Sequence, residues 1–332
     1  MTHDEWNASR LPIRGDKGHY ESWFLRANHP TEPKALWLRH TFFRPAGSPE
    51  AACGELWAAW FGDKVTGVRQ ELPLGRCYAG TTRLDLSFGD SRWTDGAARG
   101  EAKSDRHLLA WELNYEQQGA PSPIYPAWAY KGSFPKAKQV TVVPHALVSG
   151  RFVVDGEVFE ISKWPGCQSH NWGERHTDEY AWIQVSGFDQ APDAYLEGGT
   201  GRLKIGSRWT PQLSAAVLNF EGQRYELNTP LKMLRAEGSA TGLAMDVRMS
   251  SSEIDLRWRV EAPPERFIAF KYRNPPGGAL ACLNSKVARA ELTLTPKGKP
   301  SRTLTTGRAA LELLVPEDDP RVATVGHYPA GE

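Results

Sequence analysis

The feature of this sequence that most restricts its fold is a series of short runs in which successive residues alternate in character. Residues 20–27 place Glu21, Trp23 and Leu25 on one side of an extended chain, and residues 36–44 repeat the alternation. Asn, Pro and Gly residues separate the runs, and no apolar stripe with helical spacing exceeds about ten residues. Alternation with a period of two between turn residues predicts antiparallel strands, so we expect an all-β protein.

The same pattern continues to the end of the chain. Val154-Asp155-Gly156-Glu157 predicts a tight hairpin, and residues 231–236 are among the further runs that we interpret as strands. The first residues, 1–18, are polar and are expected to form a loose leader. A chain of 332 residues exceeds the usual size of one domain, so one large or two medium domains are expected. Closed barrels are the economical arrangement, because they remove exposed edge strands.

Residues 164–189 bring many polar and aromatic side chains into one short span. Pro165, Gly166 and Gly173 interrupt its first half with turn formers, and residues 180–188 alternate like a strand. A turn that leads into an amphipathic strand is typical of a binding-site wall, because loops held by a scaffold carry function. The side chains in this span are His170, Asn171, Trp172, Glu174, His176, Tyr180 and Trp182. The alternative is that these residues fill a core or its rim.

Two short motifs give the chain a resemblance to a known family. Gly18-His19-Tyr20-Glu21-Ser22-Trp23-Phe24 and His170-Asn171-Trp172-Gly173, in this order, resemble the tandem lipocalin-like family of carotenoid 1,2-hydratase (hydroxyneurosporene synthase), AttH-like proteins, tocopherol cyclase and fungal decalin-forming Diels–Alderases. The resemblance spans residues 18–315. It implies two lipocalin-like antiparallel β-barrels side by side, at residues 1–190 and 191–332, with a hydrophobic ligand in or between them. The fold alone leaves open whether the reaction is hydration, isoprenoid cyclisation or pericyclic ring closure.

Protonation of an alkene needs an acid in a dry pocket, with aromatic faces near the developing cation. The residues that we consider for this acid chemistry are Glu21, Glu174 and His176, with His170 as a donor or orienting group. Burial among Trp rings raises the pKa of a carboxyl group and suits it to general acid catalysis. The alternatives are an ion pair of Glu21 with Arg26 or Arg39, and a Glu174 that lies on a solvated turn.

A pericyclic reaction makes different demands, namely a cavity that folds the substrate and one or two donors on an activating carbonyl. It also fits a departure from the family pattern, since hydratase-like members tend to carry an acidic residue where this chain has Ser169. The aromatic side chains expected to shape the cavity are Trp23, Trp37, Trp60, Trp172, Tyr180 and Trp182, and the expected donors are His170, Asn171, Gln184, Lys271 and Tyr272. The alternatives are rings packed in a barrel core, and a turn in which the Asn171 amide satisfies backbone groups.

Other classes of site find no support in the sequence. His170 and His176 are six residues apart and lie on an expected turn rather than a helix, so no metal site is expected. A Gly-rich phosphate loop between a strand and a helix is missing, so no nucleotide cofactor is expected. The net charge of +1 gives no attraction to nucleic acid or to an anionic membrane, and no apolar run reaches ~18 residues. The four cysteines form no C-x-x-C pair.

These observations lead to one functional expectation and two alternatives. We expect a cytoplasmic, cofactor-independent monomer or homodimer that acts on a hydrophobic polyene or isoprenoid-like molecule by cyclisation, isomerisation or hydration. The first alternative is a non-catalytic carrier for a lipophilic molecule. The second is an interaction module whose cavity is filled by its own side chains.

Overall fold

The computed structural model describes residues 1–11 and 16–330, and almost all of the regular structure in them is β-strand. The strands of the first sheet are β1 (His19–Asn28), β2 (Ala35–Arg44), β3 (Cys53–Phe61), β4 (Val65–Pro73), β5 (Cys77–Ala79), β6 (Asp85–Phe88), β7 (Ser91–Thr94), β8 (Ala97–Lys103), β9 (Leu108–Gln118), β10 (Ser122–Pro123), β11 (Ala137–Val154) and β12 (Glu157–Gly173). Those of the second sheet are β13 (Glu179–Phe188), β14 (Ala191–Arg202), β17 (Leu213–Phe220), β18 (Gln223–Leu227), β19 (Glu237–Thr241), β20 (Ala244–Ser250), β21 (Ile254–Glu261), β22 (Ile268–Arg273), β23 (Ala279–Pro296) and β24 (Arg302–Pro316).

Short elements complete the described chain. The strands β15 (Lys204–Ile205) and β16 (Arg208–Trp209) form a separate hairpin. The helices are α1 (His3–Asn7), α2 (Ala127–Lys131), α3 (Pro230–Arg235) and α4 (Pro320–Val325), with 3-10 turns η1 (Pro49–Ala51), η2 (Leu74–Arg76) and η3 (Pro264–Arg266). None of the helices in the described part of the chain has the length and apolar character needed to cross a membrane.

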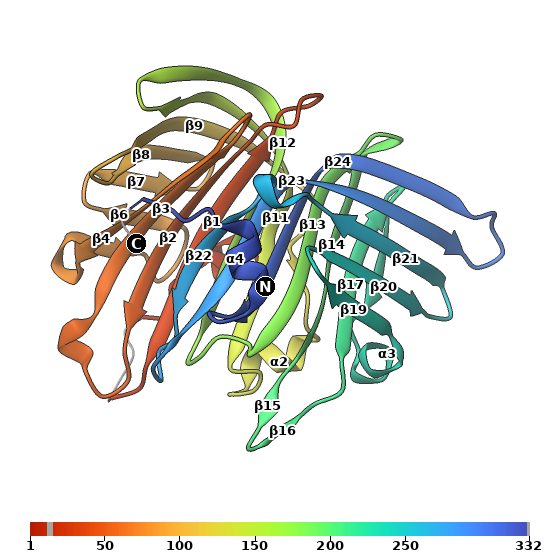
Figure 1. Cartoon of the computed structure of the whole chain (residues 1–332). Helices are drawn as coiled ribbons and strands as arrows, with labels where there is room; N and C mark the ends of the chain where they lie inside the picture. The colour runs from red at the N-terminus through yellow and green to blue at the C-terminus, as the bar shows by residue number, and fades with distance from the viewer. Residues whose placement is uncertain (12–15, 331–332) are drawn as a thin grey trace.

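The two sheets form two lipocalin-like barrels that lie side by side (Figure 1). In the first sheet the order is β4-β3-β2-β1-β12-β11-β9-β8-β7-β6-β5, and β4 also approaches β8 and β9, so the sheet curls back on itself. The second sheet has the order β18-β17-β14-β13-β24-β23-β21-β20-β19. Each barrel encloses its own apolar core. The prediction of an all-β fold with two such barrels is confirmed.

Alternation along the central strands separates an inner face from an interface between the barrels. On β1, Trp23 and Leu25 belong to the core of the first barrel, whereas Phe24 belongs to a third cluster that contains residues from both sheets. Trp182 of β13 and Phe270 of β22 are members of this mixed cluster. Such a strand therefore contributes side chains both to the core of its own barrel and to the interface between the barrels, because neighbouring side chains point to opposite faces of the sheet.

Some local expectations were right and others were wrong. The hairpin at residues 154–157 joins β11 to β12, with Asp155 and Gly156 at φ values of 51° and 91°. Residues 231–236 were expected to form a strand, but Pro230 at the first turn begins helix α3. The prediction of a loose leader was also wrong for the part of it that the structure describes, because Trp6 and Asn7 of helix α1 are buried. Residues 12–15 lie outside the described residues.

The turn expected near Pro165 and Gly173 is instead the continuation of β12. This strand runs from Glu157 to Gly173, and its pairing with β11 is shifted at several points along its length. Glycines allow the close approach of neighbouring strands, since a Cβ at Gly166 would lie 2.1 Å from the Arg26 carbonyl oxygen. The change from the first sheet to the second occurs between β12 and β13, and the division into domains at residues 190 and 191 stays a prediction.

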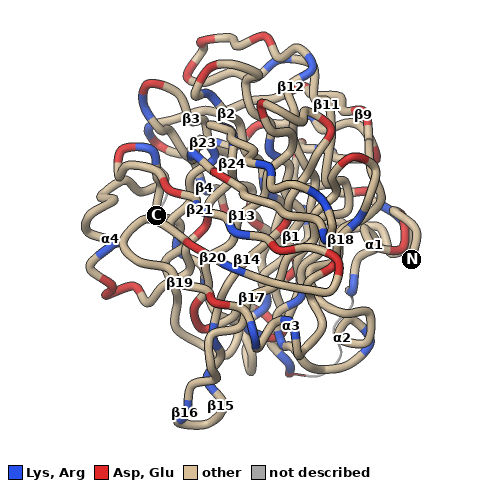
Figure 2. The backbone as a smooth tube through the Cα atoms, turned by 90° about the vertical axis from the view of Figure 1, so that its right-hand side faces the viewer, with Lys and Arg blue, Asp and Glu red and all other residues tan. Residues whose placement is uncertain are grey.

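Basic and acidic residues are interspersed in the turned view of Figure 2, in keeping with a net charge of +1. Many of the exposed charges are paired across neighbouring strands, such as Arg151 with Glu112 at 2.6 Å. Pairs of this kind in water contribute little to stability. The charges that matter for a site are therefore the buried ones.

Candidate functional site

A cavity of about 460 Å³ lies between the two barrels, which is within the size range of small-molecule sites. We call this cavity the chamber. The helices α2 and α3, which contribute to its lining, lie at the end of the molecule shown in the lower part of Figure 1. The lining side chains and glycines on which the interpretation depends are Tyr20, Arg39, Ile124, Tyr125, Trp128, Phe134, Gln139, Asn171, His176, Tyr180, Trp182, Gly199, Gly201, Ala215, Met233, Leu234 and Tyr272.

Small residues on the second sheet leave room for the chamber. Gly199 of β14 pairs with Trp182 on one side and with Ala215 of β17 on the other, so the three residues share one face. Gly201, two residues along β14, lies on that face as well. A Cβ at Gly199 would lie 3.0 Å from the Ala181 carbonyl oxygen, which is tight for backbone. The hollow between the barrels thus arises from missing side chains rather than from a gap in the sheet.

Stacked polar rings occupy one wall of the chamber. The Arg39 guanidinium carbon lies 4.3 Å from the centroid of the Tyr272 ring, and the His176 ring lies 5.4 Å from Tyr272 and 4.0 Å from Tyr20. Burial lowers the pKa of His176 to about 3, and the charge of Arg39 adds to this shift. Burial also raises the pKa of Tyr20 and of Tyr272 above the ordinary tyrosine value. At neutral pH the wall therefore presents an uncharged imidazole and uncharged phenols beside one cation.

Large apolar side chains are exposed along part of the chamber lining, together with the exposed Lys136 and Lys204. Three of these apolar side chains line the chamber: Trp128 of α2, which is 56% exposed, Phe134 after α2, which is 53% exposed, and Leu234 of α3, which is 54% exposed. Exposed large apolar side chains that gather at a cavity are typical of a surface that meets an apolar partner or ligand. The chamber thus combines a buried polar wall at Arg39 with an exposed lining that is apolar at Trp128, Phe134 and Leu234 and basic at Lys136 and Lys204.

Glu197 lies directly behind the chamber wall and connects the two barrels. Its carboxyl accepts hydrogen bonds from Trp182 Nε1 at 2.9 Å and from Gln139 Nε2 at 2.8 Å, and a third comes from the Thr141 hydroxyl. Trp182 and Gln139 both line the chamber, and Thr141 and Gln139 belong to β11 of the first sheet. Burial raises the pKa of Glu197 to about 7, and the hydrogen bonds from Thr141 and Trp182 oppose this shift only in part.

The raised pKa of Glu197 predicts a dependence of stability on pH. A glutamate with an ordinary pKa of 4.5 in the unfolded chain and about 7 in the folded chain binds its proton more tightly when folded. Its contribution to stability is fully present below pH 4.5 and is lost as the pH rises through 7. The loss amounts to about 3 kcal/mol. We expect the Glu197→Gln variant, which cannot ionise, to lack this loss.

Urea unfolding of both proteins across this pH range measures the effect. The difference in unfolding free energy between wild type and Glu197→Gln is the useful quantity, because His40 and His176, whose pKa values burial lowers to about 3, act in the opposite direction in both proteins. A difference that stays constant from pH 4.5 to pH 7.5 would contradict the assignment of a raised pKa to Glu197.

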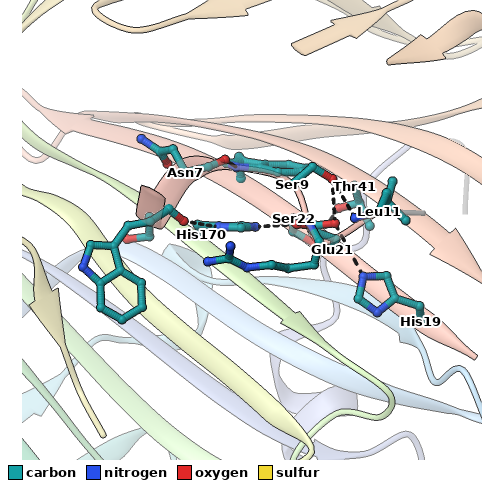
Figure 3. Close-up of polar contacts among 12 residues, drawn as sticks. Asn7, Ser9, Leu11, His19, Glu21, Ser22, Thr41 and His170 are labelled. Atoms are coloured by element: carbon teal, nitrogen blue, oxygen red, sulfur yellow. Dashed lines mark hydrogen bonds and ion pairs between the residues drawn. The ribbon is translucent and has the colours of Figure 1, made fainter. Parts of the chain in front are cut away.

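Glu21 and His170 form a buried pair on the opposite face of β1 and β12 from the chamber (Figure 3). His170 Nε2 lies 2.9 Å from Glu21 Oε1, and its Nδ1 lies 2.7 Å from the Trp6 carbonyl oxygen of α1. Ser9 Oγ and the Arg10 backbone N–H donate to the same carboxylate at 3.0 and 2.7 Å. Since a carbonyl accepts from Nδ1, the pair shares the remaining proton between Nε2 and Oε1.

The charge state of this pair follows from its surroundings. Burial raises the pKa of Glu21, but the hydrogen bonds and charges of His170 and His19 outweigh it and lower the pKa to about 2. Burial also lowers the pKa of His170, and its hydrogen bond to Glu21 opposes that shift only in part, so one proton is shared along the Nε2–Oε1 hydrogen bond. The His170 ring stacks on Trp23 at 4.5 Å. Neither Glu21 nor His170 has exposed surface, and neither lines the chamber.

Comparison with known proteins places this architecture in a family. The family described as tocopherol cyclase-like matches residues 117–313, more than half of the chain. The chain belongs to the tocopherol cyclase-like family. An uncharacterized protein of Mycobacterium tuberculosis (strain CDC 1551 / Oshkosh) is 26% identical over 319 residues, which cover 93% of this chain and 91% of the relative. The family resemblance drawn from the two motifs is thereby confirmed.

Solved structures with the same fold have much lower sequence identity to this tocopherol cyclase-like protein. An AttH-like protein from Nitrosomonas europaea has 19% identity and a TM-score of 0.53, over 92% of this chain and 96% of the other. CghA with Sch210972 has 11% identity and a TM-score of 0.56, over 94% and 97%. Kievitone hydratase from Nectria haematococca has 13% identity and a TM-score of 0.52, over 93% and 96%. At these identities the likeness establishes the fold.

Sequence reasoning named fourteen site residues, and the structure brings part of them together in this tocopherol cyclase-like protein. Those that line the chamber are Asn171, His176, Tyr180, Trp182 and Tyr272. Those on the opposite face, in or beside the first barrel, are Glu21, Trp23, Trp60, His170 and Trp172. The alternative partners for Glu21, Arg26 and Arg39, lie on the interface side, so that ion-pair alternative was wrong.

The remaining four predicted residues lie apart from the chamber lining. Trp37 packs in the mixed cluster between the barrels, and Gln184 accepts a hydrogen bond from Arg26 at 3.0 Å. Glu174 pairs with Lys136 at 2.5 Å and Lys271 with Glu317 at 2.9 Å, both on the surface. Catalytic or binding roles for all fourteen residues stay predictions.

Arg39, Glu197 and Ala215 are among the residues that sequence reasoning missed as parts of a site. A signal for the first two was present, because each is a charged residue inside a strand that directly follows a leucine, Leu38 before Arg39 and Leu196 before Glu197. Ala215 gives no such signal, because an alanine in a strand is unremarkable until its facing partner is known.

One cluster has the residue types of a metal site. Ligand atoms of Cys53, Glu55 and Glu71 lie within 4.8 Å of one another. Arg273 pairs with Glu55 at 2.5 Å and with Glu71 at 2.9 Å, and Arg69 pairs with Glu55 at 2.6 Å. Because two arginines already compensate these carboxylates, we assign no metal to the cluster.

Proposed function

We propose that this protein binds an elongated lipophilic molecule in the chamber and promotes its cyclisation without a cofactor. The observation that carries the proposal is the arrangement of the chamber, which joins exposed apolar side chains to a buried wall where uncharged hydrogen-bond donors lie beside the Arg39 cation. Such a cavity holds the apolar part of a ligand by burial and orients its polar part through a few defined contacts.

The polar groups of the chamber favour activation of a carbonyl over protonation of an alkene. Among the described residues that line the chamber, the only carboxyl is Asp178, and it is paired with Arg175. Arg39 would also repel a carbocation, by about 4 kcal/mol at 4 Å and an effective dielectric constant of 20. Phenol, imidazole and guanidinium donors instead stabilise the negative charge that develops on a carbonyl oxygen.

Ring closure fits this environment because part of its barrier is conformational. An extended chain must bring two distant parts of itself into contact, and a cavity that holds the folded form removes much of the entropic cost. A donor such as Tyr272 or His176 on a conjugated carbonyl then lowers the barrier further. Trp182 and Ile124 supply apolar walls for the folded chain.

The comparisons support the proposal at the level of the ligand class. The family carries the name of a cyclase, CghA was solved with the small molecule Sch210972, and kievitone hydratase is named for a reaction of a small molecule. The choice of cyclisation depends on the polar groups of this chamber.

Mass spectrometry of a lipophilic cell extract tests the proposal. We expect incubation of the purified protein with an extract of the cells that produce it to consume one compound and form an isomer of the same mass, because ring closure conserves all atoms. The Ala215→Phe variant, in which a ring projects into the chamber, should leave the extract unchanged. A product heavier by one water would indicate hydration instead, and a compound that is bound but unchanged would indicate a carrier.

A further inference from the structure

Arg39 is a buried cation without a carboxylate partner. It is 3% exposed, lines the chamber and, within residues 1–11 and 16–330, has no carboxylate oxygen within 4 Å. Its Nε donates to Thr41 Oγ1 at 3.1 Å and one terminal nitrogen donates to Ser22 Oγ at 2.8 Å. A guanidinium has five N–H groups, so three remain after these two bonds. A buried charge is costly unless something compensates it.

The carboxylates that act on Arg39 through space are already compensated. They belong to Glu55 and Glu312. Glu55 pairs with two arginines, and Glu312 pairs with Lys286 at 2.6 Å. The ring faces of Tyr272 and Trp57, at 4.3 and 5.4 Å, attract the Arg39 cation but supply no negative charge. Among the described residues, Arg39 thus has no carboxylate that pairs with it directly, although, against the effect of burial, Tyr272, Glu312 and Glu55 raise its pKa through space.

The two hydroxyls hold Arg39 in place rather than neutralise it. Ser22 and Thr41 are direct cross-strand neighbours on β1 and β2, and their oxygens lie 2.9 Å apart. Asn171, the neighbour of Ser22 on β12, also lines the chamber and has a buried Oδ1 without a hydrogen-bond partner. Thr41 and Ser22 therefore fix the Arg39 guanidinium in position. Asn171, next to Ser22, adds a side-chain amide oxygen that is available to a ligand.

We infer that the chamber ligand carries an acidic head group, a carboxylate or an acidic enol, which binds Arg39 while its apolar body extends toward Trp128 and Leu234. This inference rests on the proposed function, because it assumes that the chamber holds a lipophilic molecule. The planar fork of a guanidinium matches two oxygens of such a group. The buried position of Arg39 and the exposed apolar side chains of Trp128 and Leu234 set the direction in which we expect the ligand to lie.

Retinoic acid and retinol test the inference, because they share one polyene body and differ in the charge of the head group at pH 7.5. Quenching of Trp fluorescence reports their binding, since Trp182 lines the chamber. We expect the wild type to bind the acid at least about tenfold more tightly than the alcohol. Arg39→Gln should weaken binding of the acid about tenfold or more and change binding of the alcohol less than about threefold.

A matched control separates the Arg39 site from charge in general. Arg202 also borders the chamber, but its guanidinium is paired with Glu179 at 2.7 Å. Arg202→Gln should therefore keep the preference for the acid. Methyl retinoate gives a second test that needs no variant, because the ester keeps the body of the acid without its charge and should bind the wild type as weakly as retinol.

The possible failures are distinguishable. If wild type binds neither retinoid, the proposal of a lipophilic chamber is contradicted together with the inference. If it binds acid, ester and alcohol equally, the lipophilic chamber stands and the acidic head group is wrong. Should Arg39→Gln fail to fold, the wild-type comparison of acid with ester still decides the point, and Arg39→Lys, which keeps a cation, should retain part of the preference.

Discussion

Replacing Ala215 with phenylalanine is expected to weaken binding of retinol and retinoic acid by about 100-fold or more, while the protein remains folded. Ala215 lies on β17 next to Gly199, where the second sheet has no side chain that fills the chamber. A benzyl group at this position occupies space that the ligand needs, and a ligand that loses its cavity loses most of its buried contacts. Because the ring enters existing space, we expect the unfolding free energy to change by less than about 1.5 kcal/mol.

The adjacent residue is the matched control for this prediction. Ala216 has no exposed surface and points to the opposite face, into the core of the second barrel. Ala216→Phe should lower the unfolding free energy by about 1–3 kcal/mol or more, since it overpacks a filled core, and its folded fraction should still bind both retinoids. Fluorescence titration and urea unfolding of both variants measure the two effects. Similar affinity in wild type and Ala215→Phe would show that the retinoids bind elsewhere.

The contrast between these two alanines shows what could be predicted from the sequence. The alternation along β1 predicted correctly that Glu21 and Trp23 share one face of the strand and that Phe24 lies on the other. This was possible because the direction of a side chain on a strand is a local property. The alternation could not tell which face meets a second barrel, since both faces of β1 are buried. Two of the four catalytic candidates, Glu21 and His170, therefore lie on the face opposite the chamber, whereas His176 lines the chamber on the side of Arg39.

Contacts between residues that are far apart in the sequence account for the other features that the sequence analysis could not predict. Glu197 of β14 meets Thr141 and Gln139 of β11, which are more than fifty positions away in the sequence, and its raised pKa results from that burial. The family resemblance implied two barrels, which the structure confirms, and a hydrophobic ligand in or between them, which stays a prediction; its motifs lie largely on β1 and β12. It could not supply the charge balance of the chamber, which depends on side chains of both sheets.

The buried pair of Lys286 and Glu312 leads to the largest expected change in stability. Lys286 has no exposed surface, and its Nζ lies 2.6 Å from Glu312 Oε1 and 5.6 and 5.5 Å from the rings of Trp37 and Trp182. Lys286→Met leaves a carboxylate without its partner between the barrels. The loss of one partner of a buried pair typically costs about 3–5 kcal/mol. Urea unfolding at pH 7.5 should show a loss of this size.

The double variant Lys286→Met/Glu312→Leu separates the pair itself from the damage done by breaking it. Removal of both charges avoids an unpaired carboxylate, so we expect most of the lost stability to return, because replacing a whole buried pair by apolar residues is often neutral. The single variant should also regain stability as the pH falls, since protonation removes the unpaired charge of Glu312. Equal losses in the single and double variants, with no recovery in acid, would indicate that the packing of Lys286 against Trp37 and Trp182, and not its charge, holds the two barrels together.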